Sequence, residues 1–409
     1  LTKRLHDTAT EWRMINGFSD QKLNEQIRND EIDILIELSG HAAESRLRTV
    51  AMEPAPVIVK WVGGLINTTG LKAIDYLITD WVETPVGSEP EYLEKLVRMP
   101  DDYICFTPSP DSPDVKESPF RQHGFITFGC FNNPVKVNSV LLEKWAILMK
   151  KVPESRLFLK SKQYGNDSFT ARIKEQMEKL GIKKERLLFE GKSPHAELME
   201  AYNCVDIALD PWPYSGGLTT CEALWMGVPV ITCPGPTFAG RHAATHVHSA
   251  GFPEWIASSW EEYTRKIIEL ASDRVTLSEL RSSLRQIVAA SPLCDGERFG
   301  VALGRAFREM WRQRVDGYQD ETGTDDWRGH IDIGSLTVDD ETRINSEKSG
   351  SADENQVTAK VELLNEILFE NGTQTNTDPG ESIATSDRSV EDNSSHIISH
   401  RNDRASLQT

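Results

Sequence analysis

The sequence predicts an α/β protein with two lobes, each built around a parallel sheet, followed by an acidic tail. Three observations support this prediction. Short apolar runs bounded by polar residues and glycine recur up to residue 233, as is typical of strands covered on both faces. Segments with helical spacing separate these runs. After Gly317 the chain becomes polar and acidic, and aromatic residues almost vanish. A length of 409 residues leaves room for two or three domains.

The first lobe is predicted over residues 1–118. Its apolar runs are DEIDILIELSG at 30–40, APVIVKWVGG at 55–64 and IDYLITD at 74–80. Residues 44–52 have helical spacing, so this region predicts strand, helix, strand and therefore parallel pairing. The chain begins with Leu1 and enters in the middle of a pattern, and we expect it to be a fragment.

The second lobe is predicted over residues 119–317, after a linker rich in Pro, Ser and Asp at 107–119. From Phe125 to Cys233 strand and helix patterns alternate about five times, which predicts one doubly wound domain. Amphipathic helices then close this lobe. The predicted strands are FITFGCFNN, SRLFLKS, RLLFEG, DIALD and VPVITC, and the later helices are SWEEYTRKIIELASD and RFGVALGRAFREMWRQRV.

Residues 318–409 are predicted to form a mostly disordered acidic tail. Twenty acidic and seven basic residues follow Gly317, so 13 of the 18 excess negative charges lie there. The segment 355–371 is an exception, because its Val, Leu and Ile positions fit one face of a short helix. It would be either a docking segment or a transient helix in a solvated tail.

The overall charge of −18 argues against binding to nucleic acid and to anionic membranes. The sequence shows no secretory signal and no apolar run long enough to cross a bilayer. The six cysteines are scattered without a CxxC pair, which favours reduced thiols and a cytoplasmic location, or a nuclear one in a eukaryote. They are Cys105, Cys130, Cys204, Cys221, Cys233 and Cys294.

The stretch DPWPYSGGLTTCEALW carries the strongest candidate site. It follows the predicted strand DIALD, and ligands of doubly wound sheets bind at the carboxyl ends of strands. A helix beginning near Thr219 leaves backbone N–H groups free for a phosphate or diphosphate, and Thr220 adds a second hydroxyl. Gly216 and Gly217 allow close approach of the ligand. The alternative is a glycine-rich turn with a threonine cap and no ligand.

Four further side chains extend this candidate site. Glu222 lies one turn into the same helix and could accept hydrogen bonds from ribose hydroxyls. Lys136 follows the first strand of the second lobe and could reach the same diphosphate, or it serves only solubility. His195 begins a helix after RLLFEG and faces either a base or sugar, or solvent. His41 follows the first visible strand and is either an active-site histidine or a turn cap.

His242 and His246 are spaced to lie on one helix face. Neither an HExxH glutamate nor a third ligand accompanies them, so the sequence predicts no metal site. The glycine pattern at 216–217 is neither a Walker loop nor GxGxxG, which disfavours an ATPase or a dehydrogenase.

Taken together and in order, these motifs resemble the catalytic region of the O-linked N-acetylglucosamine transferase / SPINDLY family. The resemblance covers roughly residues 30–311. It rests on DILIELSGHAAESRL, EPAPVIVKWVGG, IDYLITD, CFNNPVKV, RLLFEG, VDIALDPWPYSGGLTTCEALWMGVPVIT, CPGPTFAGRHAA and FREMW. The family implies a GT-B fold of two Rossmann-like lobes and an inverting, metal-independent transfer from a nucleotide sugar to protein Ser or Thr. It also implies tetratricopeptide repeats upstream.

The resemblance also implies roles for particular residues. Lys136 matches the lysine that stabilises the departing diphosphate, and Asn133 falls where a glutamine often contacts that phosphate region. Glu222 matches the acid on the ribose. Gly217, Leu218 and Thr219 lie where the helix start holds the phosphates. Ser193 and His195 are assigned to the nucleotide-sugar site, and His41 to catalysis.

The sequence departs from the family pattern in three places. From the resemblance we expect the first part of the first lobe, with its Gly-His-Pro type motif, to be missing from this sequence. Leu198 stands where a histidine near the base is frequent, and WVGGLINTTG differs from the usual Trp-Leu-Gly-Tyr-Pro-Gly.

The leading hypothesis is therefore a protein O-glycosyltransferase that uses UDP-N-acetylglucosamine, with no cofactor or metal. One alternative is a non-catalytic module that binds a nucleotide sugar or a protein. Another is a GT-B transferase with a different donor, such as GDP-fucose or UDP-glucose, or with a non-protein acceptor.

Overall fold

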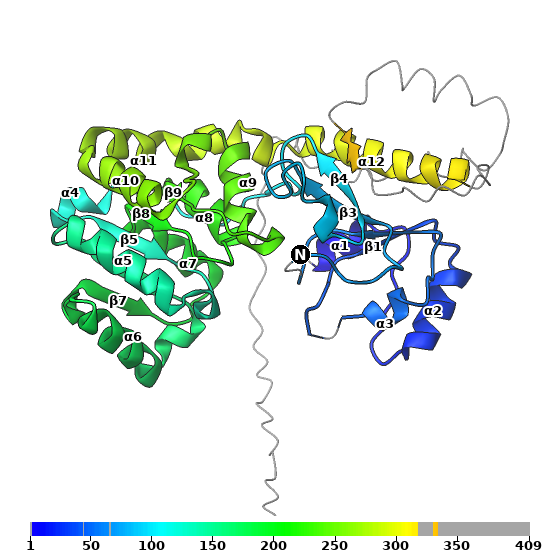
Figure 1. Ribbon diagram of the computed structural model, residues 1–409, viewed down its shortest axis with the longest axis horizontal. Helices are drawn as coiled ribbons and strands as arrows, with labels where there is room; N and C mark the ends of the chain where they lie inside the picture. The colour runs from blue at the N-terminus through cyan, green and yellow to red at the C-terminus, as the bar shows by residue number, and fades with distance from the viewer. Residues whose placement is uncertain (1, 44, 65–66, 318–329, 334–409) are drawn as a thin grey trace, which may run out of the picture. The chain divides into compact units, whose positions relative to one another are not determined.

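The chain folds around two separate parallel sheets, as the sequence predicts (Figure 1). The computed structural model describes residues 2–43, 45–64, 67–317 and 330–333. Both sheets belong to one compact unit of the chain. The helix predicted at 355–371 lies outside the described residues.

The first sheet has the strand order β1-β2-β3-β4-β10, and every neighbouring pair is parallel. Its strands β2 and β3 are buried along their whole length because they carry Val, Ile and Leu between two covered faces. The strands are β1 (Ile34–Glu37), β2 (Val57–Lys60), β3 (Tyr76–Asp80), β4 (Lys95–Met99) and β10 (His330–Asp332). The helices before β4 are α1 (Thr2–Thr8), α2 (Asp20–Asn29) and α3 (Leu47–Val50).

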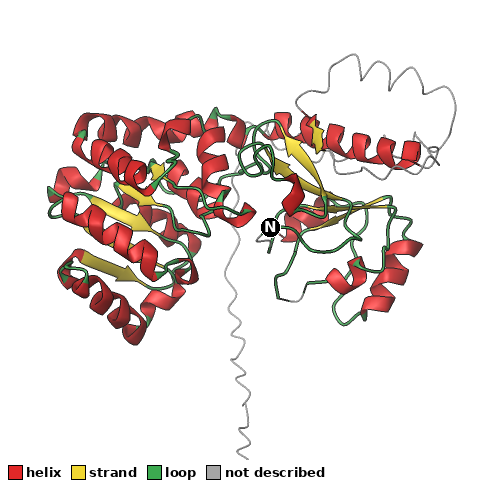
Figure 2. Ribbon diagram, viewed as in Figure 1, coloured by secondary structure: helices red, strands yellow, loops and turns green. Residues whose placement is uncertain are grey.

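The second sheet has the order β7-β6-β5-β8-β9 and is also entirely parallel. Helices cover both of its faces (Figure 2). Its strands are β5 (Thr127–Cys130), β6 (Arg156–Lys160), β7 (Leu187–Glu190), β8 (Ile207–Leu209) and β9 (Val230–Ile231). Its helices are α4 (Pro119–His123), α5 (Ser139–Lys151), α6 (Asp167–Lys179), α7 (His195–Ala201), α8 (Leu218–Trp225), α9 (His242–Ser249), α10 (Trp260–Ser272) and α11 (Arg274–Ala289).

The helices begin where the sequence offers caps. The side chain of Asn138 accepts a hydrogen bond from the backbone of Leu141 at the start of α5, and Ser259 does the same for α10. The core behind these helices is continuous, with Trp145 and Phe128 fully buried at its centre. None of the helices within the described ranges is long and apolar enough to span a bilayer.

Two elements differ from the predicted domain boundaries. Helix α12 (Gly296–Gly317), predicted as part of the second lobe, contacts β2 and β4 of the first sheet. Its apolar residues Leu303, Phe307 and Met310 join the core of that sheet. Burial of each such side chain stabilises the fold by about 1.5–3 kcal/mol. An amphipathic helix shows in sequence that it will pack, but not against which sheet.

The second difference is β10, which lies within the segment predicted to be mostly disordered. It pairs in parallel with β4 and extends the first sheet by one strand. Ile333, which follows it, is buried in the core of that sheet. Three strand residues inside a long polar stretch are too short a signal to predict.

Candidate active site

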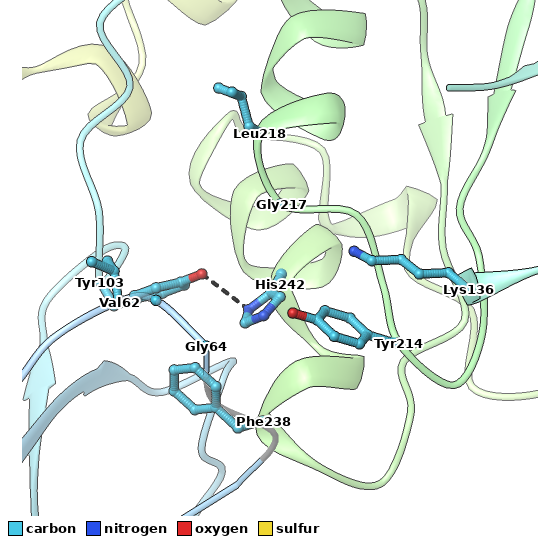
Figure 3. A pocket seen from close by; sticks show the side chains of 10 residues that line it. Val62, Gly64, Tyr103, Lys136, Tyr214, Gly217, Leu218, Phe238 and His242 are labelled. Carbon is cyan, nitrogen blue, oxygen red and sulfur yellow. Dashed lines mark hydrogen bonds between the residues drawn. The ribbon is translucent and has the colours of Figure 1, made fainter. Parts of the chain in front are cut away.

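A cavity of about 270 Å³ lies where the carboxyl edges of the two sheets meet (Figure 3). Its lining residues follow strands β2 and β4 of the first sheet and β5, β8 and β9 of the second. This is the position at which parallel α/β sheets bind ligands. The lining residues are Val62, Gly63, Gly64, Tyr103, Lys136, Tyr214, Gly217, Leu218, Phe238 and His242.

The start of α8 opens onto this cavity. Gly217 occupies the N-cap position without a side-chain hydrogen bond, and both Gly217 and Leu218 line the cavity. Within the described part of the chain, no hydrogen bond uses the backbone N–H groups of Gly217, Leu218 or Thr219. These groups carry the partial positive charge of a helix N-terminus, so this wall of the cavity suits an anion.

Lys136 brings a full positive charge to the same wall. Its Nζ donates a hydrogen bond to the backbone oxygen of Ser215 at 2.6 Å and lies 3.9 Å from the centroid of the Tyr214 ring. Burial lowers the pKa of Lys136, while the nearby Asp210 and Cys130 act to raise it. The sequence predicts Lys136 and the start of α8 at one site, and the structure brings them together.

A buried carboxylate holds the loop before α8 through hydrogen bonds. Asp210 accepts hydrogen bonds from the backbone of Gly216 at 2.6 Å and from the hydroxyl of Thr232 at 2.8 Å. Burial raises the pKa of Asp210 to about 7. A side chain at position 216 would place its Cβ 2.9 Å from the hydroxyls of both Thr219 and Thr220, so glycine is required there.

Both threonine hydroxyls at the start of α8 donate to protein acceptors. The Thr219 hydroxyl donates to Oδ1 of Asn132 at 3.1 Å, and the Thr220 hydroxyl donates to the backbone oxygen of Gly216 at 3.0 Å. The sequence predicted that they would donate directly to a phosphate, whereas the structure gives them protein acceptors. Asn132 was not singled out from the sequence, although it neighbours Asn133 on the same strand end.

Four residues predicted for the nucleotide-sugar site do not line the cavity: His195, Glu222, Ser193 and Asn133. Nε2 of His195 lies 2.9 Å from Oε1 of Glu222, which is almost fully buried. Burial raises the pKa of Glu222, and its hydrogen bond with His195 lowers it. Ser193 has a buried hydroxyl oxygen without a partner among the described residues. Asn133 is exposed, and its side chain accepts a hydrogen bond from the backbone of Val135.

His41 lies on the first-lobe side, next to the cavity rather than in its lining. Its backbone N–H donates to Gly64, which does line the cavity, at 2.8 Å. Nε2 of His41 lies 2.9 Å from the backbone oxygen of Thr69. A carbonyl oxygen only accepts, so Nε2 carries a hydrogen, and no hydrogen bond from the described residues reaches Nδ1.

The loop that carries His41 is fixed by buried charges. The carboxylate of Glu37 accepts hydrogen bonds from the backbone of Ser39 and Gly40 and lies 2.9 Å from Nζ of Lys60, which is fully buried. Gly63 packs so closely on this loop that an added Cβ would lie 1.8 Å from the backbone oxygen of Leu38.

Four aromatic residues of the cavity were not predicted to line it: Tyr103, Tyr214, Phe238 and His242. Two of them lie in segments that the sequence had already marked as candidates. Tyr214 lies within the loop that the sequence analysis singled out, and His242 was noted only as a possible metal ligand with His246. In the described ranges no three His, Cys, Asp or Glu side chains are arranged to hold a metal ion.

Comparison with known proteins adds family information to this geometry. Residues 15–107 and 121–303 match the family described as glycosyl transferase family 41, which is more than half of the chain. The 13 unmatched residues between these ranges include most of the loop that joins the two sheets.

Two plant relatives illustrate the match. A protein of Petunia hybrida, named probable UDP-N-acetylglucosamine–peptide N-acetylglucosaminyltransferase SPINDLY, is 39% identical over 386 residues, covering 89% of this chain and 40% of the petunia protein. The protein of the same name from Arabidopsis thaliana is 41% identical over 312 residues, covering 75% of this chain and 34% of its own. The chain thus spans about 40% or less of the length of these relatives.

A solved structure extends the comparison to the fold. An O-GlcNAc transferase mutant from Thermobaculum terrenum is 37% identical, with a TM-score of 0.73 and coverage of 78% of this chain and 60% of its own. The predicted α/β, GT-B-like fold is thereby confirmed.

Proposed function

The chain belongs to glycosyl transferase family 41, and from this premise we propose that it is the catalytic region of a protein glycosyltransferase. The proposed reaction moves N-acetylglucosamine from UDP-N-acetylglucosamine to Ser or Thr hydroxyls, with inversion and without a metal ion. The observation that carries the proposal is the convergence of Lys136 and the open start of α8 on one cavity.

In the proposed reaction the leaving group is a nucleoside diphosphate. The acceptor oxygen forms a bond to the anomeric carbon while the bond from that carbon to the phosphate oxygen breaks, and the electron pair leaves with the phosphate. Charge therefore grows on the phosphate in the transition state. An ammonium and a helix N-terminus already in place would stabilise that charge without reorganisation, which is the most effective form of electrostatic catalysis.

The proton of the acceptor hydroxyl must also leave. We assign this step to Nδ1 of His41, which no hydrogen bond from the described residues reaches, while Nε2–H donates to Thr69. The hydrogen bond between the His41 backbone and Gly64 couples the histidine to the cavity wall.

The other end of the donor is assigned to the second lobe. Glu222 would accept from the ribose hydroxyls, with His195 as its partner in the free protein. Asn133 and residues 216–220 would surround the phosphates, and Ser193 would lie towards the nucleoside.

The proposal extends to the domains around this region, the acceptor and the cellular compartment. A longer protein with tetratricopeptide repeats before this region is expected from the family, and the acceptor would be a protein chain. The cysteines are all free thiols, which supports a reducing compartment such as the cytoplasm.

Radiolabelled UDP-N-acetylglucosamine and a peptide library test the proposal. We expect label on Ser- and Thr-containing peptides at the same rate with and without EDTA, and a β-linkage that demonstrates inversion. Donor binding without transfer would instead identify a non-catalytic binding module. Label found only on a carbohydrate or small molecule would identify a non-protein acceptor.

A further inference from the structure

One wall of the cavity is aromatic and has no part in the steps proposed above. It consists of Tyr103 from the first lobe and Tyr214, Phe238 and His242 from the second (Figure 3). The ring centroid of His242 lies 5.8 Å from that of Tyr103, 5.3 Å from that of Phe238 and 5.9 Å from that of Tyr214. His242 is therefore held among three aromatic rings at the edge of the cavity.

Both polar neighbours of His242 approach the same nitrogen. The Tyr103 hydroxyl lies 3.0 Å from Nδ1, as the dashed line in Figure 3 shows. Oε1 of Glu83, which is fully buried behind the cavity, lies 2.6 Å from Nδ1, although this contact is poorly aligned for a hydrogen bond. Within the described residues no side chain or backbone group hydrogen-bonds to Nε2 of His242.

The neighbours of Nδ1 bear on the tautomer of His242. Burial, together with Asp80 and Asp102, raises the pKa of Glu83 well above its ordinary range, and burial also raises that of Tyr103. The Tyr103 hydroxyl therefore keeps its hydrogen and can donate it to Nδ1. Burial, then His246 and Lys136, lower the pKa of His242 to about 3, so the ring is neutral. With Tyr103 as the donor, Nδ1 accepts and the ring hydrogen resides on Nε2.

We propose that His242 donates a hydrogen bond from Nε2 to an oxygen of the transferred sugar, and that Tyr103 is the positioning residue that fixes this tautomer. The inference rests on the proposed function, because it needs a nucleotide sugar in the cavity. We assign this hydrogen bond to the sugar and not to the diphosphate, because Lys136 and the start of α8 already serve the anion. A neutral N–H among apolar ring faces is typical of sites that orient an uncharged ligand.

The experiment compares two ligands that differ only in the sugar. The affinities of UDP and UDP-N-acetylglucosamine are measured by calorimetry on the full chain and its variants, with GDP and GDP-fucose in parallel. We expect His242→Ala to weaken binding of the nucleotide sugar about three- to tenfold, the size of one hydrogen bond, and to leave binding of the nucleoside diphosphate within about twofold.

Two further variants separate a contact from a structural role. His242→Gln presents an amide N–H near the position of Nε2. It should recover most of the affinity that His242→Ala loses, because the amide can donate the same hydrogen bond. Tyr103→Phe retains the ring and should weaken binding of the nucleotide sugar but not of the nucleoside diphosphate. His248→Ala is the matched control, because His248 is an exposed histidine of the same helix α9 and does not line the cavity. It should leave the ratio of the two affinities unchanged.

The outcomes distinguish the two proposals. Equal weakening of both ligands by His242→Ala, no weakening of either, or failure of His242→Gln to recover affinity would overturn the role of His242. A wild-type chain that binds no nucleotide sugar would refute the proposed function itself.

Discussion

The two carboxyl edges that meet at the cavity each carry a lysine, and the two lysines are held in opposite ways. Lys60, at the end of β2, is fully buried and lies 2.9 Å from the carboxylate of Glu37. Lys136, after β5, has a backbone oxygen and a ring as its neighbours, and no carboxylate among the described residues lies within ion-pair distance. The first edge neutralises its charge internally, whereas the second keeps a cation available for a ligand.

This difference indicates which lysine maintains the fold and which one is suited to bind. A buried ion pair that loses one partner leaves an uncompensated charge in a medium of low polarity. A buried lysine without an acidic partner has lost solvation and has no ion pair in return. Its charge is therefore stabilised most when an anion binds. Four experiments can break or sharpen this comparison.

The largest effect is expected on the first edge, from Glu37→Ala. Loss of the carboxylate leaves Lys60 buried without its partner, so the free energy of unfolding should fall by about 3–5 kcal/mol. Chemical denaturation measures the change. The double variant Glu37→Leu with Lys60→Met should recover most of the stability. A loss below about 1 kcal/mol in the single variant would show that the pair is dispensable.

On the second edge, Lys136→Ala should reduce turnover about 100- to 1000-fold, as does the loss of other preorganised groups that stabilise a transition-state anion. The free energy of unfolding should change little, because the ammonium loses no carboxylate partner. Initial rates with labelled donor measure the effect. Lys151→Ala, at the exposed end of α5, is the matched control and should keep the wild-type rate. Near-normal turnover of Lys136→Ala would remove the lysine from the mechanism.

An effect that depends on pH is expected through Asp210. Its folded pKa of about 7 stands above the ordinary value of 3.8, so the folded state holds this proton more tightly than the unfolded state. The stability that this adds is fully present below about pH 4 and is lost as the pH rises through about 7. Unfolding measured across this range should show a weaker pH dependence in Asp210→Asn than in the wild type. The exposed Asp111→Asn should match the wild type, and identical slopes in all three would contradict the prediction.

The smallest effect is expected from Tyr214→Leu, which removes the ring beneath the Lys136 ammonium. A cation–π contact contributes roughly 0.5–2 kcal/mol, so turnover should fall about two- to thirtyfold. Tyr214→Phe retains the ring and should stay close to the wild-type rate. Equal losses in both variants would assign the effect to the hydroxyl instead.

The sequence predicts the second lobe well because its signals are local. Each strand is a continuous apolar run closed by a glycine or polar turn, and several helices have a side-chain cap such as Asn138. The partner of an element is not a local property. The packing of α12 on the first sheet and the pairing of β10 with β4 depend on contacts between residues more than 200 positions apart, so the pattern could not predict them.

The same distinction applies to the site. Lys136 and Gly217 could be predicted because each follows a recognisable strand, and the carboxyl ends of strands in one sheet lie together. Tyr103 and His242 come from different sheets, and their contact exists only once the two edges meet. The sequence likewise could not show that the hydroxyls of Thr219 and Thr220 would donate to protein acceptors, one of them Asn132 from the loop after β5.

The return of α12 to the first sheet has a practical consequence. The polypeptide crosses from one lobe to the other at residues 107–118 and crosses back before Gly296, so the lobes are joined by two covalent bridges. A protease that nicks the first bridge would yield two bands on a denaturing gel but a single species in native chromatography. If either half were expressed alone, α12 would be separated from the first sheet and apolar surface would be exposed. The gene therefore cannot be divided at the linker into two independent halves.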